Sequence, residues 1–126
     1  MADSETIAML TASTPQGELP PMPIDTGLIT DGNPVARGTV LMQTADKKVT
    51  AGIWTCEPGA FRWTYTWDEF FHVLEGAVTV ITDDGARHAL GPGDTAHFPA
   101  GLKTYWHVDR ALRKFFVLRT EEPFEL

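Results

Sequence analysis

Turn-forming residues recur along most of this chain and leave no room for long helices. From Arg37 onward, short runs of Val, Thr, Trp, Phe and Tyr alternate with turns that lie mostly about eight to sixteen residues apart. The turn signals are Glu57-Pro-Gly59, Leu74-Glu-Gly76, Asp83-Asp-Gly85, Gly91-Pro-Gly-Asp94 and Pro99-Ala-Gly101. Each supplies a residue that tolerates positive φ or fixes a turn. This pattern predicts an all-β sandwich or barrel of jelly-roll type.

The runs between the turns predict about nine strands in a single domain. They lie at 37–44, 48–56, 61–67, 69–74, 77–82, 86–90, 95–98, 103–108 and 112–119. The first 35 residues show little periodicity and hold five of the nine prolines, which is typical of an extended arm. We therefore expect an N-terminal arm over residues 1–36, a barrel over 37–119 and a C-terminal tail over 120–126.

Charge and composition exclude several classes of partner. The net charge of −7 opposes binding to nucleic acid or anionic lipid, because both need a basic face. The N-terminus carries acids where a secretory signal needs basic residues, and the apolar run at 7–10 is too short to span a bilayer. A cytoplasmic protein without nucleic-acid or membrane partners is expected.

Cys56 is the single cysteine, so the chain cannot form an internal disulfide. It lies in a strand-like run, and no residue near it in sequence obviously lowers its pKa. The sequence therefore favours a small buried hydrophobe over a nucleophile.

Two segments resemble the paired signature motifs of the cupin superfamily, whose fold is a double-stranded β-helix barrel, the RmlC-like jelly roll. They are GAFRWTYTWDEFFHVLEG, at 59–76, and GDTAHFPAGLKTYWHV, at 93–108. Glu69 and Gly76 fit the spacing of the first motif, and Gly93-Asp94 and Pro99-Ala-Gly101 fit the second. The resemblance covers residues 37–119 and implies that this region forms a cupin barrel.

The cupin resemblance also implies a metal site, but the residues present do not suit one. The family's three histidine ligands and its glutamate would fall on Trp63, Tyr65, Thr104 and Glu69. Tryptophan offers no lone pair to a cation, neutral tyrosine and threonine are poor ligands, and one carboxylate rarely holds a divalent ion alone. We expect no tightly bound metal and no other cofactor. The alternative is a divalent transition metal held by non-standard ligands such as His97.

The Trp-X-Tyr replacement at 63–65 is similar to a small single-domain branch of the cupins. That branch is grouped with ureidoglycine aminohydrolase and with the cupin part of ethanolamine-utilisation Q proteins. The aminohydrolase is a two-cupin, manganese-dependent enzyme, whereas this chain has half that length and lacks the ligand set. The resemblance therefore does not carry the activity over, although it does imply a homodimer, since cupins are frequently dimers.

Strand alternation predicts which side chains face the barrel interior. Side chains on a strand point alternately to its two faces, and the cupin pattern implies that the ligand positions point inward. His72 and His107 lie an odd number of residues from the inward positions Glu69 and Thr104, so their side chains are expected to point outward. The predicted pocket consists of Trp63, Tyr65, Glu69, Phe71, Thr104 and Trp106.

A single carboxylate among aromatic rings offers two kinds of chemistry. Loss of hydration raises the pKa of a carboxyl group, which would make Glu69 a general acid or base. If Glu69 stays ionised, it attracts an organic cation together with the ring faces, each contributing about 0.5–2 kcal/mol. We therefore predict a small, amine-containing metabolite as ligand, with Glu69 as anchor or catalytic group. A Glu69→Gln variant is then expected to keep or raise the melting temperature.

Three alternatives stay open on the sequence alone. The aromatic side chains can pack the barrel solid, as small barrels often do. The protein can be a metal-dependent enzyme of the aminohydrolase or dioxygenase kind. It can also be a dimerisation module without chemistry, whose arm covers a sheet edge of a neighbouring subunit.

Overall fold

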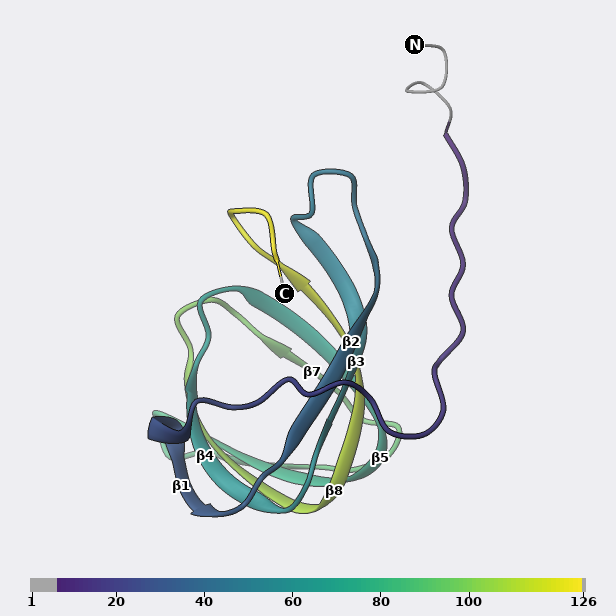
Figure 1. The fold of residues 1–126 in the computed structure, drawn as a ribbon. Coiled ribbons are helices and arrows are strands. Elements are labelled where there is room, and N and C mark those ends of the chain that lie inside the picture. Colours follow the sequence, from purple (N-terminus) through teal and green to yellow (C-terminus); the bar gives the residue numbers. More distant parts are fainter. Residues whose placement is uncertain (1–6, 126) are drawn as a thin grey trace.

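The computed structural model describes residues 7–125 as an almost entirely β structure (Figure 1). The elements are the 3-10 helix η2 (Thr26–Leu28) and the strands β1 (Ile29–Gly32), β2 (Ala36–Gln43), β3 (Val49–Cys56), β4 (Gly59–Thr64), β5 (Asp68–Thr82), β6 (Arg87–Leu90), β7 (Thr95–Phe98) and β8 (Lys103–Arg119). Neighbouring strands are antiparallel, in the order β1-β4-β8-β3-β2, and β5 joins β6 and β7 to β8. The all-β, jelly-roll prediction is confirmed. Within residues 7–125, no helix has the length and apolar character needed to cross a membrane.

The two longest strands, β5 and β8, hold the sheet together. Residues 103–108 of β8 pair with β4 and residues 112–119 pair with β3, while β5 pairs with β8 along most of its length. The sequence predicts two separate strands in each of these regions, with a turn signal at 74–76 in the first. The structure instead joins each pair into one strand, and the pairing register of β5 shifts at three places between Val73 and Val78. The turn signal at 74–76 is therefore a bulged bend within a strand.

Gly76 makes this bend possible because it lacks a Cβ. Its φ is +87°, and a Cβ built there would lie 2.0 Å from the carbonyl oxygen of Ala111. Only glycine combines this backbone conformation with such a close approach of two strands.

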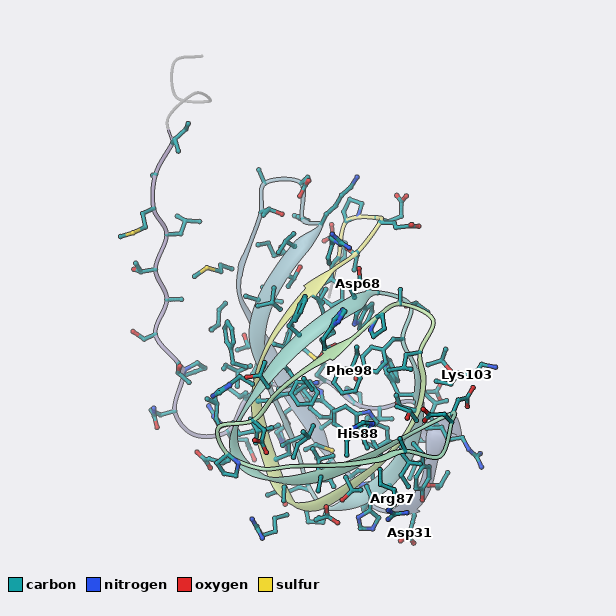
Figure 2. The ribbon with its side chains drawn as sticks, turned by 180° about the vertical axis from the view of Figure 1, so that it is seen from behind. Asp31, Asp68, Arg87, His88, Phe98 and Lys103 are labelled. Atoms are coloured by element: carbon teal, nitrogen blue, oxygen red, sulfur yellow. The ribbon has the colours of Figure 1, made fainter. Side chains whose placement is uncertain are left out.

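The hydrophobic core lies inside the curve of the sheet. Alternate residues of the long strands face it, among them Phe71 and Val73 on β5 and Val108 on β8. Phe98 of β7 lies in this interior, with its ring stacked on that of Phe71 at 5.1 Å between centroids (Figure 2). Regular strand alternation thus fills one side of the sheet with apolar groups.

The described part of the N-terminal arm packs on its own barrel. Residues 19–22 lie along the start of β2, where Gly38 N donates to Pro20 O at 2.9 Å and Met22 N donates to Ala36 O at 3.0 Å. Farther along, β1 pairs with β4, although the sequence predicts no strand before Arg37. Three of the four β1 residues are exposed, so this strand lacks the apolar alternation that a sequence pattern needs.

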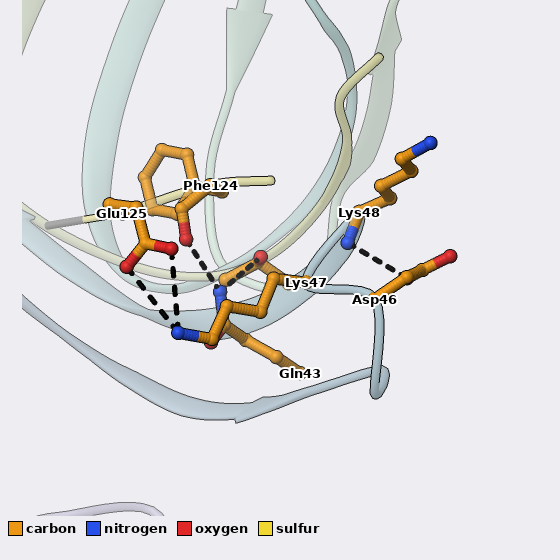
Figure 3. A network of polar contacts seen from close by, with 7 residues as sticks. Gln43, Asp46, Lys47, Lys48, Phe124 and Glu125 are labelled. Atoms are coloured by element: carbon orange, nitrogen blue, oxygen red, sulfur yellow. Dashed lines mark hydrogen bonds and ion pairs between the residues drawn. The ribbon is translucent and has the colours of Figure 1, made fainter. Parts of the chain in front are cut away.

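The C-terminal tail is fastened to the loop between β2 and β3 (Figure 3). Gln43 Nε2 donates to Phe124 O at 3.0 Å, and Phe124 N donates to Lys47 O at 2.8 Å. Lys47 Nζ also lies 3.4 Å from the Glu125 carboxylate. These contacts fix Phe124 and Glu125 beside the barrel.

Candidate functional site

A cavity of about 310 Å³ lies in the barrel, between the strands, residues 22–24 of the arm and the C-terminal tail. All four tryptophans of the chain line it. The full lining is Met22, Pro23, Ile24, Trp54, Phe61, Trp63, Tyr65, Trp67, Glu69, Trp106, Lys114, Phe116, Leu118, Phe124 and Glu125. The volume lies at the lower end of the range for small-molecule pockets, about 300–1,000 Å³.

A buried ion pair lies in the cavity wall. Glu69 of β5 is 5% exposed and Lys114 of β8 is 6% exposed. Lys114 Nζ donates to Glu69 Oε2 at 2.7 Å, and the Trp67 indole N–H donates to Glu69 Oε1 at 3.0 Å. Both carboxylate oxygens are therefore engaged by fixed donors.

The sequence-based picture of a lone carboxylate is wrong, because Lys114 neutralises Glu69. The signal for Lys114 was present in the alternation of Leu112, Lys114, Phe116 and Leu118, all of which face the core. A lysine in such a run is easily taken for a solvated charge, since lysine is rarely buried unless it is paired. The parity counted from Thr104, continued along the rest of β8, would have placed Lys114 inward.

Aromatic faces surround the Lys114 ammonium as well. Nζ lies 4.4 Å from the ring centroid of Phe71, 4.8 Å from that of Trp54 and 5.0 Å from that of Trp106. Such contacts favour a cation that has lost its hydration. Phe71 and Trp106 belong to the predicted pocket, so two of the rings that were predicted to attract a ligand's positive charge already face a charge of the protein.

Tyr65 and Trp106 form the inner part of the cavity wall, and each is 2% exposed. The Tyr65 ring stacks on Phe98 at 4.8 Å, and its backbone is held by Leu102 and Gly101. Burial raises the pKa of the Tyr65 hydroxyl well above its ordinary value, and the nearby Glu69 carboxylate adds a smaller effect in the same direction. Tyr65 therefore remains a neutral phenol at physiological pH.

The structure brings four of the six predicted pocket residues to the cavity, namely Trp63, Tyr65, Glu69 and Trp106. Phe71 lies behind the lining and presents its ring to Lys114. Thr104 is buried outside the lining, and its hydroxyl donates to the carbonyl oxygen of Trp63 at 2.7 Å. The other eleven lining residues were not predicted, among them Lys114, Trp54 and Phe124 of the tail.

Trp67 and Phe124 close one side of the cavity. Their rings meet edge to face at 5.7 Å and 89°, so the tail packs directly on the aromatic wall. Trp67 shares its parity with Trp63 and Tyr65, which is a signal that could have identified it. Nothing in the local pattern around Phe124 predicts its position, because that position depends on contacts with the distant Gln43 and Lys47.

The donor set does not fit a divalent transition ion. Glu69 is held by Lys114 and Trp67, and the Thr104 hydroxyl is held by a backbone carbonyl. Among residues 7–125, no three His, Cys, Asp or Glu side chains gather closely enough to hold a metal. His97, the alternative ligand, is exposed and stacks on Phe70 with 4.5 Å between ring centroids.

Cys56 is buried and unpaired, as predicted. Burial raises the pKa of its thiol to about 12, which leaves almost no thiolate at neutral pH. His72, His88, His97 and His107 are none of them fully buried, and His107 Nδ1 pairs with Asp109 at 2.7 Å. These residues take no part in the cavity.

Comparison with known proteins supports the cupin fold. The model of a family described as the EutQ-like cupin domain matches residues 43–116, which is more than half of the chain. The chain belongs to this cupin family. No curated protein matches the chain.

Solved structures similar to this cupin include two ethanolamine-utilisation Q proteins. The protein from Salmonella typhimurium is 26% identical, with a TM-score of 0.60 over 68% of this chain and 69% of the other. The protein from Clostridium difficile is 24% identical, with a TM-score of 0.65 over 78% and 75%. A DUF861 family protein from Thermotoga maritima is 39% identical over 51% of this chain and 73% of its own, with a TM-score of 0.50.

Proposed function

We propose that this cupin binds a small organic molecule with a largely apolar body in its barrel cavity, without a tightly bound metal. The observation that carries the proposal is the convergence of all four tryptophans on one cavity that also contains a buried ion pair. Binding sites for small molecules are characteristically apolar and aromatic, with a few fixed polar groups. A barrel filled by its own side chains would leave no such space.

An amine is no longer the favoured ligand, because its attraction rested on an unpaired Glu69. An organic cation would now meet the Lys114 ammonium in the same wall. Glu69 also has both oxygens engaged, so we assign it the role of a fixed counter-ion rather than that of a general base.

Native mass spectrometry of untagged protein from its own host tests the proposal. We expect an organic molecule that remains bound under native conditions and is released on unfolding, with transition metals far below one per chain. A Trp63→Ala variant, which removes one lining wall, should retain less of it.

Two results would contradict the proposal. One is a transition metal at one ion per chain. The other is the absence of any bound molecule, together with a diverse fragment set that leaves the tryptophan fluorescence unchanged. Because every tryptophan lines the cavity, any occupant should alter the emission.

A further inference from the structure

A polar group in the cavity wall is left without a partner by the protein itself. The Trp106 ring packs against Phe61, Phe71 and Phe98, but its buried indole N–H makes no hydrogen bond to any residue of 7–125. Leaving a buried donor unpaired costs about 1–3 kcal/mol, so native structures rarely tolerate it without a reason.

The Tyr65 hydroxyl is the natural acceptor for this N–H. Trp106 acts on the phenol as a hydrogen-bond donor would, since it lowers the Tyr65 pKa against the larger effects of burial and of Glu69. The two groups nevertheless do not reach normal hydrogen-bond geometry. Closer approach of the Tyr65 hydroxyl to this N–H would complete the bond and leave the phenol proton free to be donated elsewhere.

The charges around these two groups are already balanced. Lys114 and Glu69 contribute one positive and one negative charge in direct contact. Glu125, the third charged residue of the lining, is paired with Lys47 at 3.4 Å. A charged ligand would bring an uncompensated charge into an apolar wall, which is strongly unfavourable. An uncharged ligand avoids this cost.

We propose that the ligand is an uncharged molecule with a carbonyl-type oxygen, such as an amide, ketone or lactone, on an apolar body. Its oxygen accepts a hydrogen bond from the Tyr65 hydroxyl, and Tyr65 accepts one from the Trp106 indole N–H. The chain of two bonds satisfies the unpaired donor, and each bond strengthens the other. The inference rests on the proposed function, since it names the ligand class of the same cavity.

Three probes with the same phenyl body test this inference: benzamide, benzoate and benzylamine. In fluorescence and NMR titrations, we expect benzamide to bind at least roughly tenfold more tightly than the two charged probes. Benzamide should also shift the indole proton resonance of Trp106 in the wild-type protein, assigned with a Trp106→Phe variant.

Tyr65→Phe removes the one hydroxyl that would donate to the ligand and accept from Trp106, and Tyr105→Phe is its matched control. The two tyrosines are the only ones in the chain, and the Tyr105 hydroxyl accepts a hydrogen bond from Thr30 without lining the cavity. Tyr65→Phe should weaken benzamide binding roughly tenfold, the equivalent of one hydrogen bond, and Tyr105→Phe should leave it unchanged.

The outcomes separate this inference from the proposed function. Tighter binding of benzoate or benzylamine, an unmoved Trp106 resonance, or an unchanged benzamide affinity in Tyr65→Phe would overturn the inference alone. Binding of other fragments but of none of the three probes would also overturn only the inference. If no fragment binds at all, the proposed function falls with it.

Discussion

Among single residues, the buried charges of Glu69 and Lys114 stabilise each other. Without its partner, either one would be an unpaired buried charge. A Lys114→Met variant keeps the length of the apolar stem but removes the ammonium. We expect it to lower the free energy of unfolding by about 3–5 kcal/mol, as measured by urea unfolding. The same reasoning reverses the expectation for Glu69→Gln, which should now destabilise the protein by leaving Lys114 unpaired.

The double variant Glu69→Gln with Lys114→Met provides the control. With both charges removed, most of the lost stability should return, since no buried charge remains to be desolvated. Unchanged stability in Lys114→Met alone would show that the ion pair is not buried as described.

The raised pKa of the buried Cys56 thiol should lower the free energy of unfolding at alkaline pH. Its folded pKa of about 12 lies above the ordinary value of 9.0, so the folded state holds the proton more tightly. Below pH 9.0 the thiol is protonated in both states and has little effect. As the pH rises from 9.0 toward 12, the unfolded chain loses its proton first, and stability falls by up to about 1.4 kcal/mol per pH unit.

Urea unfolding of wild type and Cys56→Ala between pH 7.5 and pH 10.5 measures how much of the stability loss comes from Cys56. Tyr65 has a raised pKa too and contributes a loss of the same sign, so the difference between the two proteins is the relevant quantity. Parallel pH profiles would contradict the assignment to Cys56.

Among the strands and turns, Gly76 and Gly85 offer a controlled comparison. Their φ values are +87° and +84°, but only Gly76 has the Ala111 backbone against it, whereas Gly85 has open space. Gly85→Ala should cost about 1 kcal/mol from backbone strain alone. Gly76→Ala should cost at least about 2–3 kcal/mol, because the Ala111 strand must also move.

Thermal and urea unfolding of both variants measure the difference. Equal losses would mean that β5 and β8 do not approach each other as closely as described at the bulge. Since the two changes are chemically identical, the comparison isolates the strand contact.

The strands illustrate which structural features a local pattern can predict. Alternation and turn residues correctly indicate an all-β fold and the approximate position of seven strands of the structure, from β2 to β8. They do not reveal that Gly76 bends a strand instead of ending it, because the distinction lies in the pairing with the distant Ala111. For the same reason β1, whose pairing with β4 buries little apolar surface, leaves no pattern to detect.

In the candidate site too, strand alternation predicts some residues, whereas others are placed by tertiary contacts. Trp63, Tyr65, Glu69 and Trp106 lie on strands whose parity the sequence fixes, and the structure places them at the cavity. Phe124 comes from a segment without strand periodicity, so its place depends on tertiary contacts alone. Their functional roles stay predictions.

At the scale of the whole molecule, the arm forms part of the cavity wall. Met22, Pro23 and Ile24 line the cavity, and residues 19–22 bond to β2. Deleting residues 1–14 should leave melting temperature and benzamide binding intact. Deleting residues 1–24 should weaken binding and cost about 3 kcal/mol, since three hydrogen bonds to β2 are lost at about 1 kcal/mol each.

Calorimetry and titration of the two truncated proteins measure these effects, and identical behaviour would remove the arm from the site. The solution mass of the same samples tests the expected homodimer. The hydrogen bonds described here join the arm to its own barrel, so dimer formation does not require the arm to cross to a neighbour.

The cavity owes part of its enclosure to residues 22–24 of the arm and to Phe124 and Glu125 of the C-terminal tail. Phe124 is attached to the barrel by two backbone contacts, whereas each strand is attached by a continuous ladder. Detaching a terminus costs far less free energy than separating paired strands. A bound molecule would therefore be released more easily by detachment of Phe124 and Glu125 than by separation of the strands.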